Sequence, residues 1–314
     1  MSLDIETIID RRRLKRRLSL WRLAALVALG AAILILLPST QFGPTGDHVA
    51  RVTLSGLIID DRAQQDLIRE IGESDNAKAL LLYIDSPGGT TTGSEALYET
   101  VRKVAETKPV VAVLGTVAAS GGYIAALSAD HIVSRGNTIT GSIGVFFQLT
   151  QVTGLMETIG VDVDYVRSAP LKAQPNMFED PPREALRSTQ EMVDASYNWF
   201  IGLVVDRRSL DEQAARKLSD GRVYTGWQAM ENGLVDAIGG EEAARAWLFD
   251  EHDVANDLPT EDWTVDEETD FSSLAGQALV RMVALAASEI GEKTLSTKGL
   301  TLDGLVSVWH PESR

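Results

Sequence analysis

The sequence predicts an α/β fold built from βαβ units, and three observations carry this prediction. Apolar runs of strand length alternate with amphipathic stretches of helix length through residues 48–135. The runs at 77–89 and 109–120 are apolar on both faces, which is typical of buried parallel strands. Each of these two runs reaches a Gly-Gly pair and then a helical pattern. A parallel sheet with helices packed against it accounts for all three.

The individual elements follow from the local pattern. Residues 48–59 alternate apolar and polar side chains as a strand does, whereas Leu67, Ile68 and Ile71 share one helical face. The predicted strands are 48–59, 77–89, 109–120 and 131–135. The predicted helices are 61–74, 90–107, 121–129 and 183–208. Residues 211–240 are expected to form a helix, a short strand or turn, a second helix and an exit.

The N-terminal region predicts a membrane anchor. The basic cluster RRRLKRR is followed at residues 18–37 by 20 residues with a single charge, Arg22, close to the start. Roughly 20 apolar residues span a bilayer as a helix. A cleaved signal peptide is the alternative, but its apolar core would be ~7–15 residues long and a small-residue cleavage site would follow. The positive-inside rule places residues 1–17 in the cytoplasm and the body outside, as in a single-pass protein of a bacterial inner membrane.

Three further segments complete the predicted organisation. Residues 38–47 form a polar linker, and residues 48–245 form the α/β domain. The C-terminal extension, 246–314, is acidic at 266–270 and carries an amphipathic stretch at 274–290. This stretch suits packing or an interface better than an anionic membrane surface, because it holds few basic residues.

Composition and charge exclude several classes of function. Residues 1–22 carry seven basic and three acidic side chains, a net charge of +4. The whole chain has a net charge of −16, so the rest carries −20, which argues against binding to nucleic acid. The chain has no cysteine and only four histidines, so we expect no disulfide, no metal site and no cofactor.

Two turns at strand ends are candidates for chemistry. One is IDSPGG, which contains Gly88 and Gly89, and the other is AASGG, which contains Ser120 and Gly121. Ligands of open α/β sheets bind at the carboxyl ends of the strands. Backbone N–H groups of glycines and of a helix N-terminus can form an oxyanion hole for a serine nucleophile. The alternatives are a tight connection and a serine that only caps a helix.

A nucleophilic serine needs a base, and the sequence favours a lysine over a histidine. His131 opens the strand after the helix that follows Ser120, which is expected at the opposite end of the sheet. Lys172 lies in SAPLKAQP without an adjacent acid. Apolar surroundings disfavour the charged form of lysine and leave a neutral amine that accepts a proton. A solvated loop lysine is the alternative.

Taken in order, the motifs YIDSPGG, AASGGYIAALSAD, TITGSIGV, SAPLKAQP and DGRVYTGWQAMENGLVDAIGG resemble the S49 family of serine peptidases, in the short form of signal peptide peptidase A. The resemblance covers residues 48–245 and implies a ClpP/crotonase-like spiral fold with a Ser-Lys dyad. The implied roles are Ser120 as nucleophile, Lys172 as general base, Ser142 as the residue that orients the lysine, Gly89 and Gly121 as oxyanion donors, and Gly88 as their support.

The same resemblance implies released signal peptides and similar apolar peptides as substrates. It also implies a homo-oligomer in which neighbouring protomers complete each active site, which leaves open whether Ser120 and Lys172 meet within one protomer or across a subunit boundary. Three alternatives stay open. A Ser-His-Asp triad lacks its histidine in the stretch SIGVFF, an acyl-CoA enzyme would not need the anchor, and a catalytically silent peptide-binding scaffold would not need the dyad.

Overall fold

A computed structural model describes residues 46–265 and 306–308 of the chain. The expected cytoplasmic segment, the transmembrane anchor, most of the linker and the stretch at 274–290 lie outside the described residues. Within the described ranges, no helix has the length and apolar character needed to cross a membrane.

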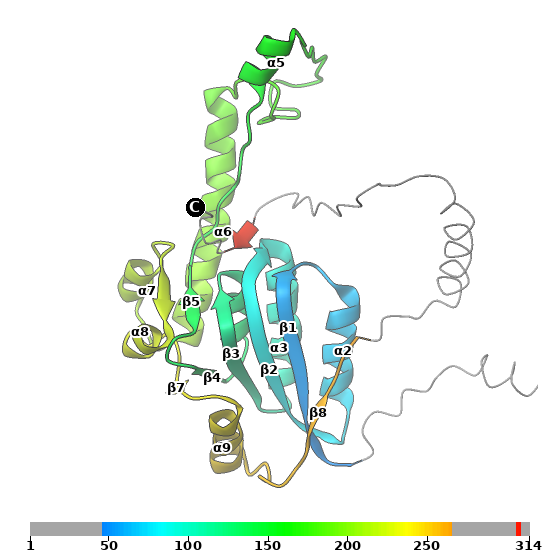
Figure 1. The fold of residues 1–314 in the computed structure, drawn as a ribbon, viewed down its shortest axis with the longest axis vertical. Coiled ribbons are helices and arrows are strands. Elements are labelled where there is room, and N and C mark those ends of the chain that lie inside the picture. The colour runs from blue at the N-terminus through cyan, green and yellow to red at the C-terminus, as the bar shows by residue number, and fades with distance from the viewer. Residues whose placement is uncertain (1–45, 266–305, 309–314) are drawn as a thin grey trace, which may run out of the picture. The chain divides into compact units, whose positions relative to one another are not determined.

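The described residues form one nine-stranded sheet (Figure 1). The first five strands in chain order are joined to one another by parallel pairing. Its main path runs β6-β5-β3-β2-β1-β8, with β4 pairing with β3 and β7, and β9 pairing with β2. The strands are β1 His48–Ile58, β2 Ala77–Thr90, β3 Val110–Ala119, β4 His131–Ser134, β5 Ile139–Gly141, β6 Val223–Thr225, β7 Ala237–Ile238, β8 Thr260–Asp262 and β9 Val306–Val308. The α/β fold with a mainly parallel sheet is therefore confirmed.

Helices cover both faces of this sheet. They are α2 Arg62–Glu73, α3 Thr91–Ala105, α4 Gly121–Leu127, α5 Thr153–Ile159, α6 Arg183–Arg207, α7 Glu212–Leu218, α8 Gly226–Glu231 and α9 Glu241–His252. The strands and helices predicted between residues 48 and 240 all form. The expected domain boundary at 245 falls inside α9, and the next strand, β8, pairs with β1, so the sheet draws on residues 260–262 as well as on β9.

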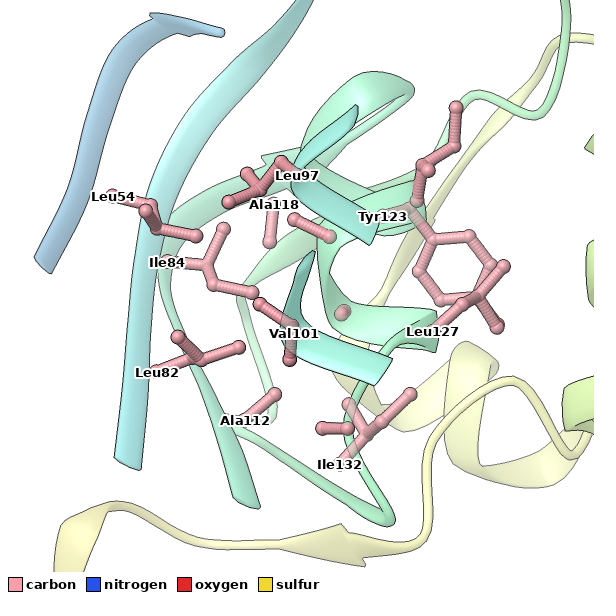
Figure 2. Close-up of a cluster of buried hydrophobic side chains, with 14 of the residues drawn as sticks. Leu54, Leu82, Ile84, Leu97, Val101, Ala112, Ala118, Tyr123, Leu127 and Ile132 are labelled. Carbon is pink, nitrogen blue, oxygen red and sulfur yellow. The ribbon is translucent and has the colours of Figure 1, made fainter. Parts of the chain in front are cut away.

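The core explains why two strands are apolar on both faces. Along β2, Leu82 and Ile84 pack with α3 and α4 in one cluster, to which Val101 and Tyr123 also belong (Figure 2). Leu81, whose side chain points the other way, belongs to a second cluster that includes residues of α9. Because both faces of β2 are covered, no position along its centre tolerates a polar side chain without a partner.

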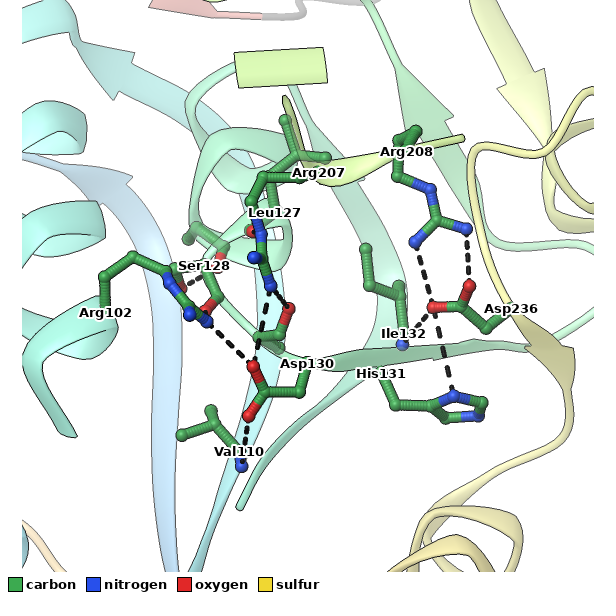
Figure 3. Close-up of polar contacts among 12 residues, drawn as sticks. Arg102, Val110, Leu127, Ser128, Asp130, His131, Ile132, Arg207, Arg208 and Asp236 are labelled. Atoms are coloured by element: carbon green, nitrogen blue, oxygen red, sulfur yellow. Dashed lines mark hydrogen bonds and ion pairs between the residues drawn. The ribbon is translucent and has the colours of Figure 1, made fainter. Parts of the chain in front are cut away.

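Polar contacts fix the C-terminal end of α4, the helix that begins beside Ser120 (Figure 3). Arg207 of α6 donates to the carbonyl oxygens of Leu127 at 3.0 Å and Ala129 at 2.9 Å. The carboxylate of Asp130 accepts from Arg102 at 2.8 Å and from the backbone N–H of Val110 at 3.2 Å. These bonds satisfy carbonyl groups that a helix end otherwise leaves open, and they tie α4 to α3 and α6.

A second pair, Arg208 and Asp236, lies beside the first strand residues of β4 (Figure 3). The guanidinium donates to the two carboxylate oxygens at 2.6 and 2.9 Å, and the backbone N–H of Ile132 donates to the same carboxylate at 2.8 Å. Burial acts to raise the pKa of Asp236, but the bonds and the charge from Arg208 outweigh it and hold that pKa below its ordinary value. The pair therefore stays ionised at neutral pH.

The segment from residue 145 to 195, here called the arm, leads away from the sheet. It contains α5 and the N-terminal half of α6, and Figure 1 shows α5 at the end of α6 that lies farthest from the sheet. Helix α5 has no buried residue, whereas the buried side chains of α6 gather near its C-terminal end, at Phe200, Ile201, Leu203 and Val204. The arm thus exposes an apolar surface that nothing in the described chain covers.

Candidate active site

Ser120 lies at a strained turn between β3 and α4. Its backbone dihedrals are φ 56° and ψ −117°, a region that residues with a Cβ rarely adopt and that costs on the order of 1–3 kcal/mol. Its N–H donates to the carbonyl of Gly141 at 2.8 Å, and its carbonyl accepts from Tyr123 and Ile124 at 2.9 Å. The side chain does not cap α4. The turn therefore does more than end a strand and start a helix, since a cap would not require this strain.

The second turn, at the end of β2, stays paired with β1 as far as its glycines, after a register shift between Ser55 and Leu57. Gly88 pairs with Leu57 and Gly89 pairs with Ile58. Gly88 has φ 115°, which favours glycine, and a Cβ at Gly89 would lie 1.7 Å from the Ile58 carbonyl oxygen. Both positions therefore require glycine, the first for its dihedral angle and the second for its contact with β1.

The two turns meet. A Cβ placed on Gly121 would lie 3.0 Å from the nitrogen of Gly89 and 3.3 Å from the carbonyl carbon of Gly88. The first residue of α4 therefore packs directly on the backbone of β2. The N–H groups of Gly89 and Gly121, expected as oxyanion donors, belong to segments in contact, on the side of β2 where Ser120 also lies.

Two serines that were not singled out from the sequence hold this junction together. The Ser86 hydroxyl donates to the carbonyl of Gly56 at 2.6 Å and accepts from the N–H of Gly88 at 3.1 Å. The Ser94 hydroxyl donates to the carbonyl of Thr90 at 2.9 Å. A serine just before Pro-Gly-Gly was the available signal for Ser86, because short hydroxyl side chains bond to neighbouring backbone in turns. Nothing local distinguishes Ser94 from any other helical serine.

Ser142 lies beside Ser120 through the pairing of β5 with β3. Ala119 is opposite Gly141 in this parallel ladder, so the two serines are the next residue on each strand. Ser142 also has a positive φ, 50°, and only 8% of it is exposed. Its N–H donates to the carbonyl of Arg222 at 2.8 Å. Two hydroxyl groups are thus brought together at one strand end from positions 22 residues apart.

Lys172 is not brought to this point by its own chain. It lies in the segment between α5 and α6, which Figure 1 shows at the end of the arm farthest from the sheet, and its side chain is exposed. In the single chain, Lys172 therefore has the solvated loop position that the sequence leaves open as the alternative. The physical reason is the arm itself, which carries Ala, Pro and Leu of SAPLKAQP away from the core instead of into it.

The register of β4 excludes His131 as the base. His131 pairs with Val111, near the start of β3, whereas Ser120 follows the last residue of that strand. Its ring stacks on Trp247, with centroids 4.7 Å apart. The prediction that His131 lies at the opposite end of the sheet is confirmed. Within residues 46–265 and 306–308, no group of three or more acidic or histidine side chains could hold a metal ion.

The C-terminal strand β9 occupies the edge of β2 beside Ser120. Gly88, Gly89 and Thr90 pair antiparallel with residues 306–308. The pairing of β2 with β3 ends at Ser86. Beyond that residue, β1 occupies one edge of Gly88 and Gly89. Because a strand has only two edges, β9 takes the one that β3 leaves open. This edge therefore accepts an extended chain segment.

Two adjoining cavities continue from Ser142 along the base of the arm. One is about 360 Å³ and is lined by Ile143, Gly144 and Tyr197 among others. The other is about 420 Å³ and is lined mainly by apolar side chains, Phe146, Leu149 and Leu186 included. Both contact Val145, Gln190 and Val193, so they adjoin each other. The larger of the two, with its mainly apolar lining, is here called the apolar groove.

Comparison with known proteins identifies the class of this protein. A sequence profile of peptidase family S49 matches residues 102–255, and one of Clp protease matches residues 50–137. A protein of Synechocystis sp. with the provisional name of protease is 35% identical over 205 residues, which are 65% of this chain and 74% of the relative. A protein of Enterococcus faecium with the provisional name signal peptide peptidase SppA is 32% identical over 216 residues, 64% of this chain and 63% of the relative. The chloroplastic serine protease SPPA of Arabidopsis thaliana is 36% identical over 181 residues, 57% of this chain and 27% of the relative.

The α/β fold and these matches together define a serine peptidase. More specifically, the chain belongs to peptidase family S49. The family and the class of reaction expected from the sequence are thereby confirmed.

Proposed function

We propose that this peptidase hydrolyses apolar peptides derived from membrane proteins, released signal peptides among them, with Ser120 as nucleophile and Lys172 as general base. The observation that carries the proposal is the setting of Ser120. It is a buried serine, 1% exposed, held at φ 56° where β3, α4 and the two glycines of β2 meet. Strain of this kind persists where the surrounding structure enforces it, which is common at sites of chemistry.

The proposed reaction is acyl transfer to a serine. The neutral amine of Lys172, oriented by Ser142, accepts the Ser120 proton while the hydroxyl oxygen attacks the scissile carbonyl. The N–H groups of Gly89 and Gly121 donate to the oxyanion, and one such donor contributes about 2.7–4 kcal/mol in comparable enzymes. The lysinium then protonates the leaving amine. Water, deprotonated by the same amine, hydrolyses the ester, and no cofactor takes part.

The dyad as proposed forms between protomers of a homo-oligomer. Lys172 lies on the arm, away from the Ser120 of its own chain, and the arm exposes large apolar side chains such as Leu155, Ile159 and Phe146. Apolar patches of this kind commonly mark interaction surfaces. An arm that covers the Ser120 of a neighbour would bury its apolar side chains and deliver the lysine in one step.

Two features support an extended apolar peptide as the substrate. The edge of β2 beside Ser120 takes a segment of chain as an antiparallel strand, over Gly88 to Thr90. Strand addition of this kind binds a peptide through its backbone, whatever its side chains. The groove along Val145, Phe146 and Leu186 then offers an apolar surface for the side chains. A cleaved signal peptide has this chemistry.

Residues 18–37 complete the proposal as a membrane anchor. They hold 20 residues with one charge, behind a basic cluster that the positive-inside rule keeps in the cytoplasm. The catalytic domain then lies on the outer side of the cytoplasmic membrane, where cleaved signal peptides remain. Protease added to spheroplasts is expected to digest the domain without lysis, and protection until lysis would contradict this topology.

Cleavage of a synthetic signal peptide, followed by mass spectrometry, tests the proposal directly. The wild-type chain is compared with Ser120→Ala, Lys172→Ala and His131→Gln, and circular dichroism verifies that each variant is folded. Loss of a catalytic serine or of its base lowers kcat by at least ~10³-fold in related systems. We expect that loss for the first two variants and none for His131→Gln. Activity retained by Lys172→Ala would overturn the dyad.

The alternative function, a catalytically silent scaffold that binds peptides, makes a different prediction. It shares the β2 edge and the apolar groove, so it binds the same peptides. A wild-type chain that binds the synthetic peptide without cleaving any peptide offered would favour the scaffold. The membership in a peptidase family and the strain at Ser120 favour catalysis.

A further inference from the structure

We propose that Glu179 is a positioning residue that holds the loop carrying Lys172 in one shape. This loop, residues 167–179 and here called the lysine loop, has Lys172 close to its middle. The inference rests on the proposed function, in which Lys172 is the general base. It adds a residue that neither touches the peptide nor transfers the proton, yet sets where the amine can reach.

The carboxylate of Glu179 gathers three side chains from different points of the lysine loop. Arg167 donates to both of its oxygens, at 3.3 Å to Oε2 and by a shorter bond to Oε1. The amides of Gln174 and Asn176 donate to Oε1 at 2.8 and 2.6 Å. The bond from Arg167 to Glu179 closes the loop at its base, and the two amides draw its second half toward the same carboxylate.

Backbone contacts carry this constraint to the lysine. The N–H of Lys172 donates to the carbonyl of Ala169 at 3.1 Å, and the N–H of Gln174 donates to that of Leu171 at 3.2 Å. Asn176, besides its bond to Glu179, donates to the carbonyl of Ala173 at 3.0 Å. Lys172 therefore lies in two overlapping turns, 169–172 and 171–174, and the second ends at Gln174, whose side chain is bonded to Glu179.

Charge in the lysine loop is arranged so that Glu179 does not capture the amine. Hydrogen bonds from Arg167 hold the pKa of Glu179 below its ordinary value, so the carboxylate is ionised at neutral pH and forms a neutral pair with the guanidinium. Arg167 is fixed on its other side by the ring of Tyr165, 4.2 Å from its central carbon. Among the described residues, no hydrogen bond or ion pair joins the amine of Lys172 to Glu179.

The same arrangement leaves Arg167 Nε and Gln174 Oε1 buried without a hydrogen-bond partner among the described residues, which costs stability. A rigid presentation matters here because a displacement of about 1 Å in a reacting group costs up to ~10²-fold in rate.

Signal-peptide cleavage by the full chain tests the inference with four variants. Glu179→Gln removes the charge, and Arg167→Glu combined with Glu179→Arg reverses the pair. Because Gln174 and Asn176 are amides, they can accept from an arginine at 179 as readily as they donate to a carboxylate. Glu157→Gln, at an exposed position of α5, is the matched control on the same arm. Lys172→Ala reports on the proposed function itself.

We expect Glu179→Gln to lower kcat by ~10–100-fold with the melting temperature unchanged, and to change KM much less than kcat, because the lysine loop contributes only Pro175 to the apolar groove and does not pair with the β2 edge. The reversed pair should recover most of that loss, and Glu157→Gln should match wild type. Equal kcat for Glu179→Gln and wild type, with Lys172→Ala inactive, would overturn the positioning role alone. An active Lys172→Ala variant would overturn both the role and the proposed function.

Discussion

The backbone of Gly121 lies against the backbone of Gly89, so the two proposed oxyanion donors belong to residues in contact. A Cβ at position 121 would come within 3.0 Å of the Gly89 nitrogen and within 2.4 Å of the Ser94 hydroxyl oxygen. The contact with the Ser94 oxygen is shorter than real Cβ contacts, and the one with the Gly89 nitrogen lies at their lower limit. A side chain at position 121 therefore requires Ser94 to rotate and the backbone of β2 or α4 to shift.

Gly121→Ala is expected to reduce catalysis much more than it reduces folding. The methyl group pushes Gly89 and the start of α4 apart, which moves one or both N–H donors away from the oxyanion. Loss of one donor costs about 10²–10³-fold in kcat in comparable enzymes. Steady-state cleavage of the synthetic signal peptide measures this loss, and thermal melting shows that the variant remains folded.

Two further variants separate two causes of the lost activity, a displaced N–H donor and the collision with Ser94. Gly202→Ala, in α6, has no atom within 4 Å of the new methyl group and should leave catalysis unchanged. Ser94→Ala combined with Gly121→Ala removes the 2.4 Å collision but keeps the one with Gly89. Wild-type activity in this double variant would show that the collision with Ser94, and not the displaced donor, is responsible.

The ion pair of Arg208 and Asp236 predicts a stability that depends on pH. The pKa of Asp236 is lower in the folded chain than in the unfolded chain, so the unfolded state binds more protons in acid. The contribution of this ion pair to the free energy of unfolding is complete above the pKa of the carboxyl in the unfolded chain, about 3.9. It is lost as pH falls through the lower pKa of the folded chain. Asp236→Asn should lower the free energy of unfolding by on the order of 2 kcal/mol at pH 7, because Arg208, 9% exposed, loses its partner.

Urea denaturation of a soluble chain that begins at Gly46, from pH 7 to pH 3, measures this difference. The difference in the free energy of unfolding between wild type and Asp236→Asn should narrow below about pH 4. His131 lies 4.0 Å from the same carboxylate, and burial lowers its pKa. The comparison is therefore repeated with His131→Gln in both chains. A gap that stays constant down to pH 3 would be inconsistent with the lowered pKa of Asp236.

The exposed face of α5 predicts an assembly that forms through the arm. Leu155 and Ile159 are each 62% exposed and lie one helical turn apart. Leu155→Glu with Ile159→Glu should dissociate the oligomer and lower kcat by at least ~10³-fold, as loss of the base does, because Lys172 no longer reaches the Ser120 of a neighbour. Light scattering measures the mass, and peptide cleavage is followed on the same samples.

Phe249→Glu in α9 is the matched control, since this side chain is 47% exposed but lies outside the arm. It should leave both mass and activity unchanged. A monomeric wild-type chain that cleaves peptide at full rate would contradict the shared active site. An arm variant that keeps both its mass and its activity would also contradict the shared active site.

The central sheet could be predicted because the apolar residues that indicate each of its long strands follow one another directly in the sequence. The run at 77–89 is apolar on both faces in the sequence for the same reason that β2 is covered on both faces in the fold. Ser120, Gly89 and Gly121 could be proposed because strand ends of a parallel sheet share one edge, where the contact of Gly121 with Gly89 places them.

The parts that were missed depend on partners far away in the chain. Strands β5 and β8 are three residues each, too short to show a period, and they exist because β3 and β1 offer open edges. The sequence left the position of Lys172 open between an apolar and a solvated environment, because its apolar neighbours in sequence resemble a buried segment. Nothing in those residues indicates that α6 carries them away from the core.

The pairing of β9 with β2 predicts that the C-terminus competes with the peptide substrate. Residues 306–308 take the edge of Gly88 to Thr90 that an extended peptide needs. A tethered segment acts at an effective concentration that reaches the millimolar range with short flexible linkers. A chain that ends at residue 305 should therefore show a KM about 10-fold lower for the synthetic signal peptide, at unchanged kcat.

Ser307→Pro in the full chain tests the same competition without changing the length. Proline lacks the N–H that a strand interior needs, so this variant should release β9 and lower KM as the truncation does. A free peptide of the last nine residues, added to the truncated chain, should raise KM again in proportion to its concentration. If KM is the same for wild type, truncation and Ser307→Pro, then β9 leaves the edge at no measurable cost and the C-terminus does not compete with substrate.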